Sequence, residues 1–119
     1  MYGIDKSISF NFLVGKELLQ LCIGLYQLIL NFTDQLVISA ECVIRLKNPD
    51  GSVVEISCDS PELSGSLTCL LGRAIEAVQT EVNGELNLSF SGGFQLSIVD
   101  SNEDEESFTI TMDEHEIVV

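Results

Sequence analysis

The chain has 119 residues, of which 45% are hydrophobic, and its 19 acidic and 5 basic side chains give a net charge of −14. This length and composition predict a single globular domain with its own core, and they exclude a disordered acidic tail as the whole molecule. Because so acidic a chain repels phosphate groups, binding to nucleic acid or to an anionic membrane surface is disfavoured.

The negative charge is concentrated in the second half of the chain. Residues 1–60 hold 7 acids and 4 bases, whereas residues 61–119 hold 12 acids and a single base. Such a surface attracts a basic protein partner or cations. Simple solubility explains an acidic surface equally well, so both interpretations stay open at this point.

The cysteines and the apolar stretches bear on the compartment. No CxxC spacing is present, which argues against a zinc knuckle or a redox motif; the four cysteines are Cys22, Cys42, Cys58 and Cys69. The first residues, MYGIDKS, lack the pattern of a secretory signal, and the longest apolar run, residues 18–30, is too short to span a bilayer. We therefore expect a cytoplasmic protein with reduced, mostly buried thiols.

The first part of the chain predicts a short helical turn and then strands. Residues 9–15, SFNFLVG, are typical of roughly one turn of helix before Gly15. Residues 16–24, KELLQLCIG, precede the alternating run YQLILNFTDQLVIS at residues 26–39. Together these two stretches favour a strand–turn–strand arrangement.

Residues 35–47, QLVISAECVIRLK, indicate one long strand. The turn NPDG at residues 48–51 closes this strand, because Pro49 presets φ and Gly51 can adopt a positive φ. Residues 52–58, SVVEISC, return as a further strand, which places on one face Val54, Ile56 and Cys58.

A short helix is expected at residues 60–72, SPELSGSLTCLLG. Ser60 is a suitable N-cap, Pro61 suits the first helical position, and Gly72 can end the helix. Gly65 weakens this helix, so we expect only two or three turns.

Residues 74–82 show apolar residues at helical spacing, yet Asn83-Gly84 is a typical hairpin signal with a strand on either side. We therefore predict a strand at residues 74–82, with a helix as the open alternative. Strands at residues 85–90 and 94–99 follow, and the glycine-containing turn SGG joins them. Residues 107–112, SFTITM, predict a fourth strand on the same sheet, which presents to the same face Phe108, Ile110 and Met112.

Two stretches of the sequence match in their apolar positions. Gly15 matches Gly72 at an offset of 57, and each glycine is followed by a base, Lys16 or Arg73. After the next turn the offset becomes 58, and the matched residues are Leu28, Leu30, Phe32, Leu36 and Ile38 with Leu86, Leu88, Phe90, Phe94 and Leu96. This correspondence predicts an internal repeat.

The predicted fold class is therefore mainly β, with α+β at the margin. Two repeated antiparallel β-meander units, at about residues 10–58 and 67–112, form one compact domain spanning residues 1–119, together with one or two short helices. Residues 113–119 are expected to form an acidic C-terminal tail.

Residue types that commonly carry chemistry are sparse. His115, the single histidine, stands among acids near the C-terminus, where a solvated charge run is a better interpretation than a metal site. The segment at residues 100–106 has acids spaced as in a calcium loop, but it lacks the EF-hand glycine at the sixth position and the acid at the twelfth. We expect no catalytic, cofactor-binding or metal-binding residues. Lys16 and Arg73 either bind an anion at equivalent positions or act as counter-charges, and the second interpretation is preferred.

The lead-in FLVG at residues 12–15 and the hairpin NGELNLSFSGGFQLSI at residues 83–98 resemble a bacterial family of small domains of unknown function. Members of that family carry an LxG lead-in and a GxLxLxFxxGxxL hairpin. The resemblance covers roughly residues 10–112, and it implies no activity and no site residues. In size and acidity the chain is also similar to immunity proteins that neutralise bacterial toxins.

The favoured functional hypothesis is a non-enzymatic protein that binds a basic protein partner, as an immunity protein or inhibitor does. The acidic segment would supply the contact residues, which are Asp100, Glu103, Asp104, Glu105 and Glu106. The alternative is a metal-dependent or small-ligand enzyme that uses carboxylates at strand ends. A homodimer, formed through exposed strand edges or through the sheet face with Ile29 and Val37, is a further hypothesis.

Overall fold

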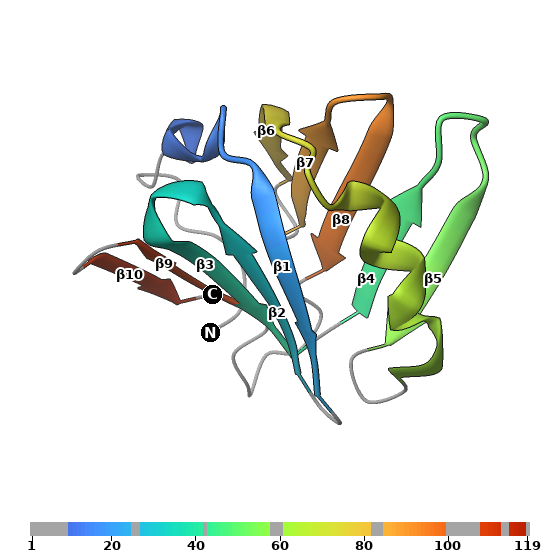
Figure 1. Cartoon of the computed structure of the whole chain (residues 1–119), viewed down its shortest axis with the longest axis horizontal. Helices are drawn as coiled ribbons and strands as arrows, with labels where there is room; N and C mark the ends of the chain where they lie inside the picture. The colour runs from blue at the N-terminus through green and yellow to red at the C-terminus, as the bar shows by residue number, and fades with distance from the viewer. Residues whose placement is uncertain are drawn as a thin grey trace.

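The computed structural model describes residues 10–24, 27–41, 43–57, 61–81, 85–99, 108–112 and 115–118, and within them the chain forms two five-stranded antiparallel sheets (Figure 1). The first sheet has the strand order β1-β2-β3-β9-β10, and the second has the order β5-β4-β8-β7-β6. The strands are β1 (Leu18–Ile23), β2 (Leu28–Phe32), β3 (Leu36–Ala40), β4 (Val43–Lys47), β5 (Val53–Ser57), β6 (Ile75–Thr80), β7 (Leu86–Phe90), β8 (Phe94–Val99), β9 (Phe108–Met112) and β10 (His115–Val118). The predicted mainly-β class is confirmed.

Three short 3-10 helices accompany the strands in the described residues: η1 (Asn11–Leu13), η2 (Thr33–Gln35) and η3 (Pro61–Leu70). The short helical segments expected before Gly15 and between the halves are therefore present, although η3 is a 3-10 helix and not an α-helix. No helix in the described part of the chain is both long enough and apolar enough to cross a membrane.

The two predicted meanders are β1–β2–β3 and β6–β7–β8, and residues 75–80 form a strand, as predicted. Their registers agree in detail. Leu18 pairs with Phe32 in the first meander, as Ile75 pairs with Phe90 in the second, and the same irregularity follows each pair. We call two residues matched when their residue numbers differ by 57, which applies up to the ends of β1 and β6, or by 58, which applies to the rest of the two meanders.

Reciprocal hydrogen bonds join the starts of the two meanders. The Gly15 N–H donates to the Ile75 carbonyl at 2.7 Å, and the matched Gly72 N–H donates to the Leu18 carbonyl at 2.8 Å. An approximate two-fold relation therefore connects β1 and β6, although these strands belong to different sheets.

The strands that follow each meander in the chain join the sheet of the other meander, which corrects two predictions. β4, followed by β5, lies beside β8, and β9, followed by β10, lies beside β3. Residues 35–47 do not form one strand: β3 ends at Ala40 in the first sheet, and β4 begins at Val43 in the second. Similarly β9 pairs with β3 of the first sheet and not with the second meander. The alternation of buried residues continues where the chain passes from the first sheet to the second, because the even-numbered residues of both strands face the shared core. These residues are Ile38, Ala40, Ile44 and Leu46.

The core lies between the sheets and is closed at one opening by η3, whose Leu67 and Leu70 are fully buried. Phe32 and Phe90, at matched positions, stack with ring centroids 6.3 Å apart. Each meander therefore contributes its equivalent aromatic ring to the same contact.

The expected acidic tail is the third correction, because residues 115–118 form β10 and pair with β9. Ile117 stands opposite Ile110 in this pairing. The residue types of Ile117 and Val118 favour a strand over a solvated tail, and the neighbouring acids hide that signal in the sequence.

Candidate functional site

The acidic residues predicted to contact a partner, Asp100, Glu103, Asp104, Glu105 and Glu106, lie outside the described residues. Their segment joins β8 of the second sheet to β9 of the first. The side chain of His115 is likewise not described, although its backbone pairs with Met112.

Lys16, one of the two matched bases, has a structural partner. Its Nζ donates to Asp34 Oδ2 at 2.7 Å, and the Lys16 side chain is only 19% exposed. Asp34 lies in the turn between β2 and β3 and has a positive φ of 61°. The ion pair therefore anchors an unfavourable turn conformation to the start of β1.

Arg73 makes a different set of contacts at the matched position. Its Nε donates to the Cys69 carbonyl at 2.9 Å and its Nη1 to the Ser91 carbonyl at 3.2 Å. The guanidinium also lies 4.6 Å from the ring centroid of Phe94. Both matched bases therefore stabilise turns of the scaffold. Lys16 does so by pairing with an acid, as the counter-charge interpretation expects, whereas Arg73 does so through carbonyls and an aromatic ring.

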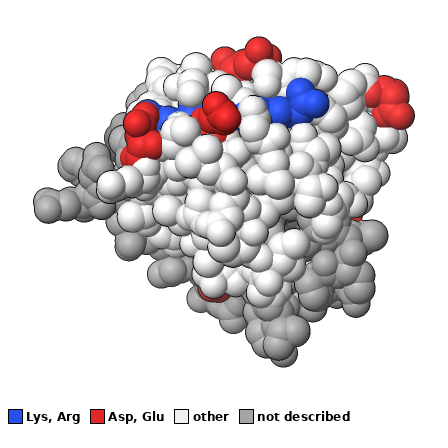
Figure 2. Space-filling view, in the orientation of Figure 1, with Lys and Arg blue, Asp and Glu red and all other residues white. Residues whose placement is uncertain are grey.

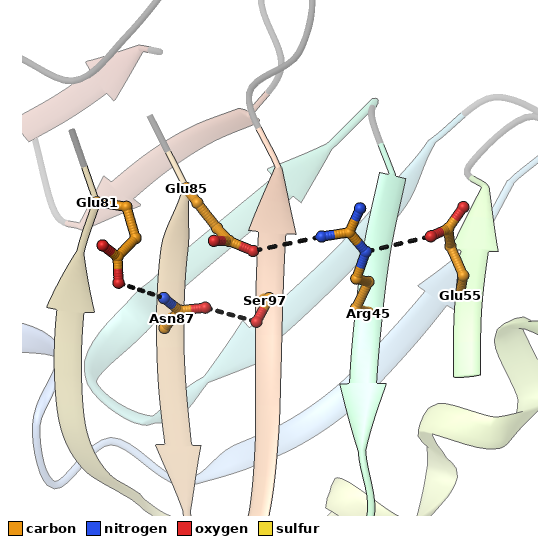
Figure 3. A network of polar contacts seen from close by, with 6 residues as sticks. All are labelled: Arg45, Glu55, Glu81, Glu85, Asn87 and Ser97. Atoms are coloured by element: carbon orange, nitrogen blue, oxygen red, sulfur yellow. Dashed lines mark hydrogen bonds and ion pairs between the residues drawn. The ribbon is translucent and has the colours of Figure 1, made fainter. Parts of the chain in front are cut away.

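A row of polar side chains crosses the outer face of the second sheet (Figure 3). The register places directly opposite one another, from β5 to β6, the residues Glu55, Arg45, Ser97, Asn87 and Gln79. Two further acids, Glu81 and Glu85, stand beside this row, and the Glu81 N–H donates to the Glu85 carbonyl at 2.8 Å. We call this group the glutamate face.

Asn87 is the centre of the glutamate face and is buried, with an exposure of 9%. Its Oδ1 accepts from Ser97 Oγ at 2.5 Å, and its Nδ2 donates to Glu81 Oε1 at 3.4 Å. The amide thus offers a carboxylate at the end of β6 an uncharged donor.

Arg45 bridges the other acids of this face. Its Nε donates to Glu55 Oε2 at 3.1 Å, and its Nη1 lies 3.7 Å from Glu85 Oε1, across β8 (Figure 3). The small side chain of Ser97 lies between them on β8 and leaves room for this contact. Two carboxylates, Glu55 and Glu85, therefore share one guanidinium, and with Glu81 the face carries three acids and one base.

Other chemistry is limited in the part of the chain that the structure describes. No group of three or more His, Cys, Asp or Glu residues there is arranged to hold a metal ion. Cys22 and Cys69 are free thiols and half-buried. The pKa of Asp50 is lowered, because the Ser52 hydroxyl and N–H both donate to its carboxylate, at 2.6 and 2.9 Å.

The matched turns and the glutamate face were only partly visible in the sequence. Lys16 and Arg73 were found there, but the glutamate face was not. The alternation around Asn87 is that of any polar residue on an outer face, and its burial arises from neighbours on other strands.

Comparisons with known proteins support the sequence resemblance. No similar curated protein and no similar solved structure was found. A model for a family of unknown function, DUF6188, matches residues 12–119, and the chain therefore belongs to that family.

Proposed function

We propose that this domain is a non-enzymatic binding protein that captures a basic protein partner, in the manner of an inhibitor or immunity protein. One relationship carries the proposal. Leu86 pairs with Ile98 near the end of β8, so Glu85, which precedes Leu86, stands beside the point where the chain continues into Asp100. Glu81 lies at the same end of the sheet, because its N–H bonds to Glu85.

The carboxylates of the glutamate face already have contacts within the domain. Glu81 is held by Asn87, and Glu85 contacts Arg45. Side chains that are already fixed lose less conformational entropy on binding. The fork of an incoming arginine matches a carboxylate in two hydrogen bonds, so basic side chains of a partner suit this face.

The net charge of −14 adds a long-range attraction to these contacts. Such attraction accelerates the encounter with a basic protein and is screened by salt, with a Debye length of about 8 Å at physiological ionic strength. Affinity for the partner should therefore fall steeply as the salt concentration rises.

The test is affinity capture from a lysate of the source cells, with identification of the bound proteins and titration of the purified partner against salt. The variant Glu81→Gln/Glu85→Gln should weaken binding of that partner and reduce the dependence on salt. The control Glu17→Gln/Glu76→Gln removes the same two charges at the opposite end of the meanders, where Ile75 pairs with Phe90, and should change binding little. Equal loss of binding in both variants, or binding that is unchanged in high salt, would contradict the proposal.

A further inference from the structure

The matched positions allow the outermost strands of the two meanders to be compared directly. β1 and β6 are each the outermost strand of a sheet. β6 carries Glu76 just after its first residue, and an exposed charge is the usual protection of an edge strand. At the matched position β1 carries Leu19, which is 59% exposed.

The two ends of β1 are also apolar. Ile23, at the far end, is 47% exposed, whereas the matched residue of β6 is Thr80. At the near end, the Gly72 N–H bonds to the Leu18 carbonyl, which brings Leu71, 43% exposed, alongside β1. We call the surface formed by Leu19, Gln20, Ile23 and Leu71 the β1 edge.

This surface is uncharged in a strongly charged molecule. Residues 18–33 contain no acidic or basic side chain, although the chain has 24 of them. Figure 2 shows charged side chains along the upper margin of this side of the molecule and uncharged atoms over its middle, where β1 and η3 lie in Figure 1. The electrostatic repulsion that opposes association of two such acidic molecules is therefore weakest at the β1 edge.

η3 contacts β1, but the outer backbone groups of Leu19–Ile23 have no strand partner beyond β2 among the described residues. The outer N–H and C=O groups of such a strand are a template for an added strand. The irregularity between Leu18 and Gln20 affects only the start of the strand, and the pairing from Gln20 to Ile23 is continuous.

We propose that β1 pairs antiparallel with β1 of a second copy of the chain, so that two first sheets join across a two-fold axis. A second copy is the occupant that the charges favour. Two molecules of charge −14 repel each other wherever carboxylates face carboxylates, and the β1 edge brings them together without such contacts. Antiparallel self-pairing also satisfies the two-fold symmetry that is commonest among oligomers.

The test is sedimentation equilibrium of the full chain over a range of protein and salt concentrations. The expected result is a dimer of twice the 13.0 kDa chain mass. Its association should strengthen with added salt, because salt screens the repulsion between the copies. The variant Leu19→Glu/Ile23→Thr, which gives β1 the residues that β6 already carries, should be monomeric with an unchanged circular dichroism spectrum. The control Glu76→Gln should remain dimeric.

Hydrogen exchange locates the interface. Dilution of the protein should speed exchange of those amides of Leu19–Ile23 that point away from β2, whereas packing through the face with Ile29 and Val37 would leave those amides insensitive to dilution. A monomer at every concentration, a dimer that survives Leu19→Glu/Ile23→Thr, or dilution-sensitive exchange elsewhere would each overturn the proposal. The salt effect separates this result from the proposed function, because partner capture weakens with salt and this dimer strengthens.

Discussion

Arg73 lies across Gly92, and its guanidinium occupies the space that a side chain at Gly92 would need. The matched residue in the first meander is Asp34, which instead extends its carboxylate to Lys16. Both turn positions have positive φ, 86° at Gly92 and 61° at Asp34. The same backbone turn is thus held once by an ion pair and once by an arginine packed on a bare glycine.

Gly92→Ala is expected to lower the free energy of unfolding by roughly 2–3 kcal/mol, because it adds the cost of a left-handed conformation to the displacement of Arg73. Gly51→Ala is the control. Gly51 has a φ of 92° but nothing within 4 Å of an added Cβ, so only the conformational cost of about 1–2 kcal/mol applies. Urea denaturation measures both. Equal effects would show that the packing of Arg73 on Gly92 contributes nothing.

Removing the two matched bases should have unequal effects. Arg73→Ala deletes two hydrogen bonds to carbonyls and a contact with the Phe94 ring, and we expect a loss of roughly 2–3 kcal/mol. Lys16→Ala deletes one ion pair whose acid, Asp34, is 70% exposed, so the expected loss is about 0.5 kcal/mol. Thermal or urea unfolding checks the order, and a larger effect at Lys16 would contradict it.

The pKa of Asp50 depends on Ser52. The hydroxyl and the N–H of Ser52 stabilise the ionised carboxylate and lower its pKa below the ordinary value of 3.8. A lowered folded-state pKa means that the stabilisation is complete above the unfolded-state value and is lost as the pH falls through the folded-state value. Ser52→Ala should raise the pKa of Asp50 toward 3.8. A carboxyl chemical-shift titration measures it, and an unchanged titration would rule out the hydroxyl as the main cause.

Divalent cations should not bind specifically to the glutamate face. On the glutamate face the acids contact nitrogen donors of Arg45 and Asn87, and the described residues form no cluster suited to a metal. Melting curves with calcium, magnesium, manganese and zinc should match a sodium chloride control of equal ionic strength. A specific shift with one ion at low concentration would favour the metal-dependent alternative.

Sequence periodicity predicted the meanders well because it reports which side chains face a core. Comparing the two matched stretches correctly indicated a strand at residues 75–80, where helical spacing pointed the other way. Periodicity does not report which sheet a strand joins. Ile38 and Ile44 both continue the alternation of buried residues, although the chain changes sheet between them. The sequence therefore could not show that β4 joins the second sheet and β9 the first. The glutamate face was missed for a related reason, since it depends on register among five strands.

Asn87 is the residue whose replacement tests the glutamate face most directly. Asn87→Ala removes the acceptor of Ser97 Oγ and the donor to Glu81, and we expect a loss of roughly 1–3 kcal/mol, because buried polar groups lose their partners. Ser89→Ala, two residues along the same strand and outside this network, should change stability by less than about 0.5 kcal/mol.

The double variant Asn87→Ala/Ser97→Ala separates the hydrogen bond from the packing. Deleting both partners leaves no unsatisfied hydroxyl, so its loss of stability should be smaller than the sum of the two single losses. Because Asn87 also holds Glu81, Asn87→Ala should weaken capture of a basic partner while Ser89→Ala should not. Additive stability losses would show that the contact between Asn87 and Ser97 carries little energy, and unaltered capture would show that an ordered Glu81 is not needed for binding.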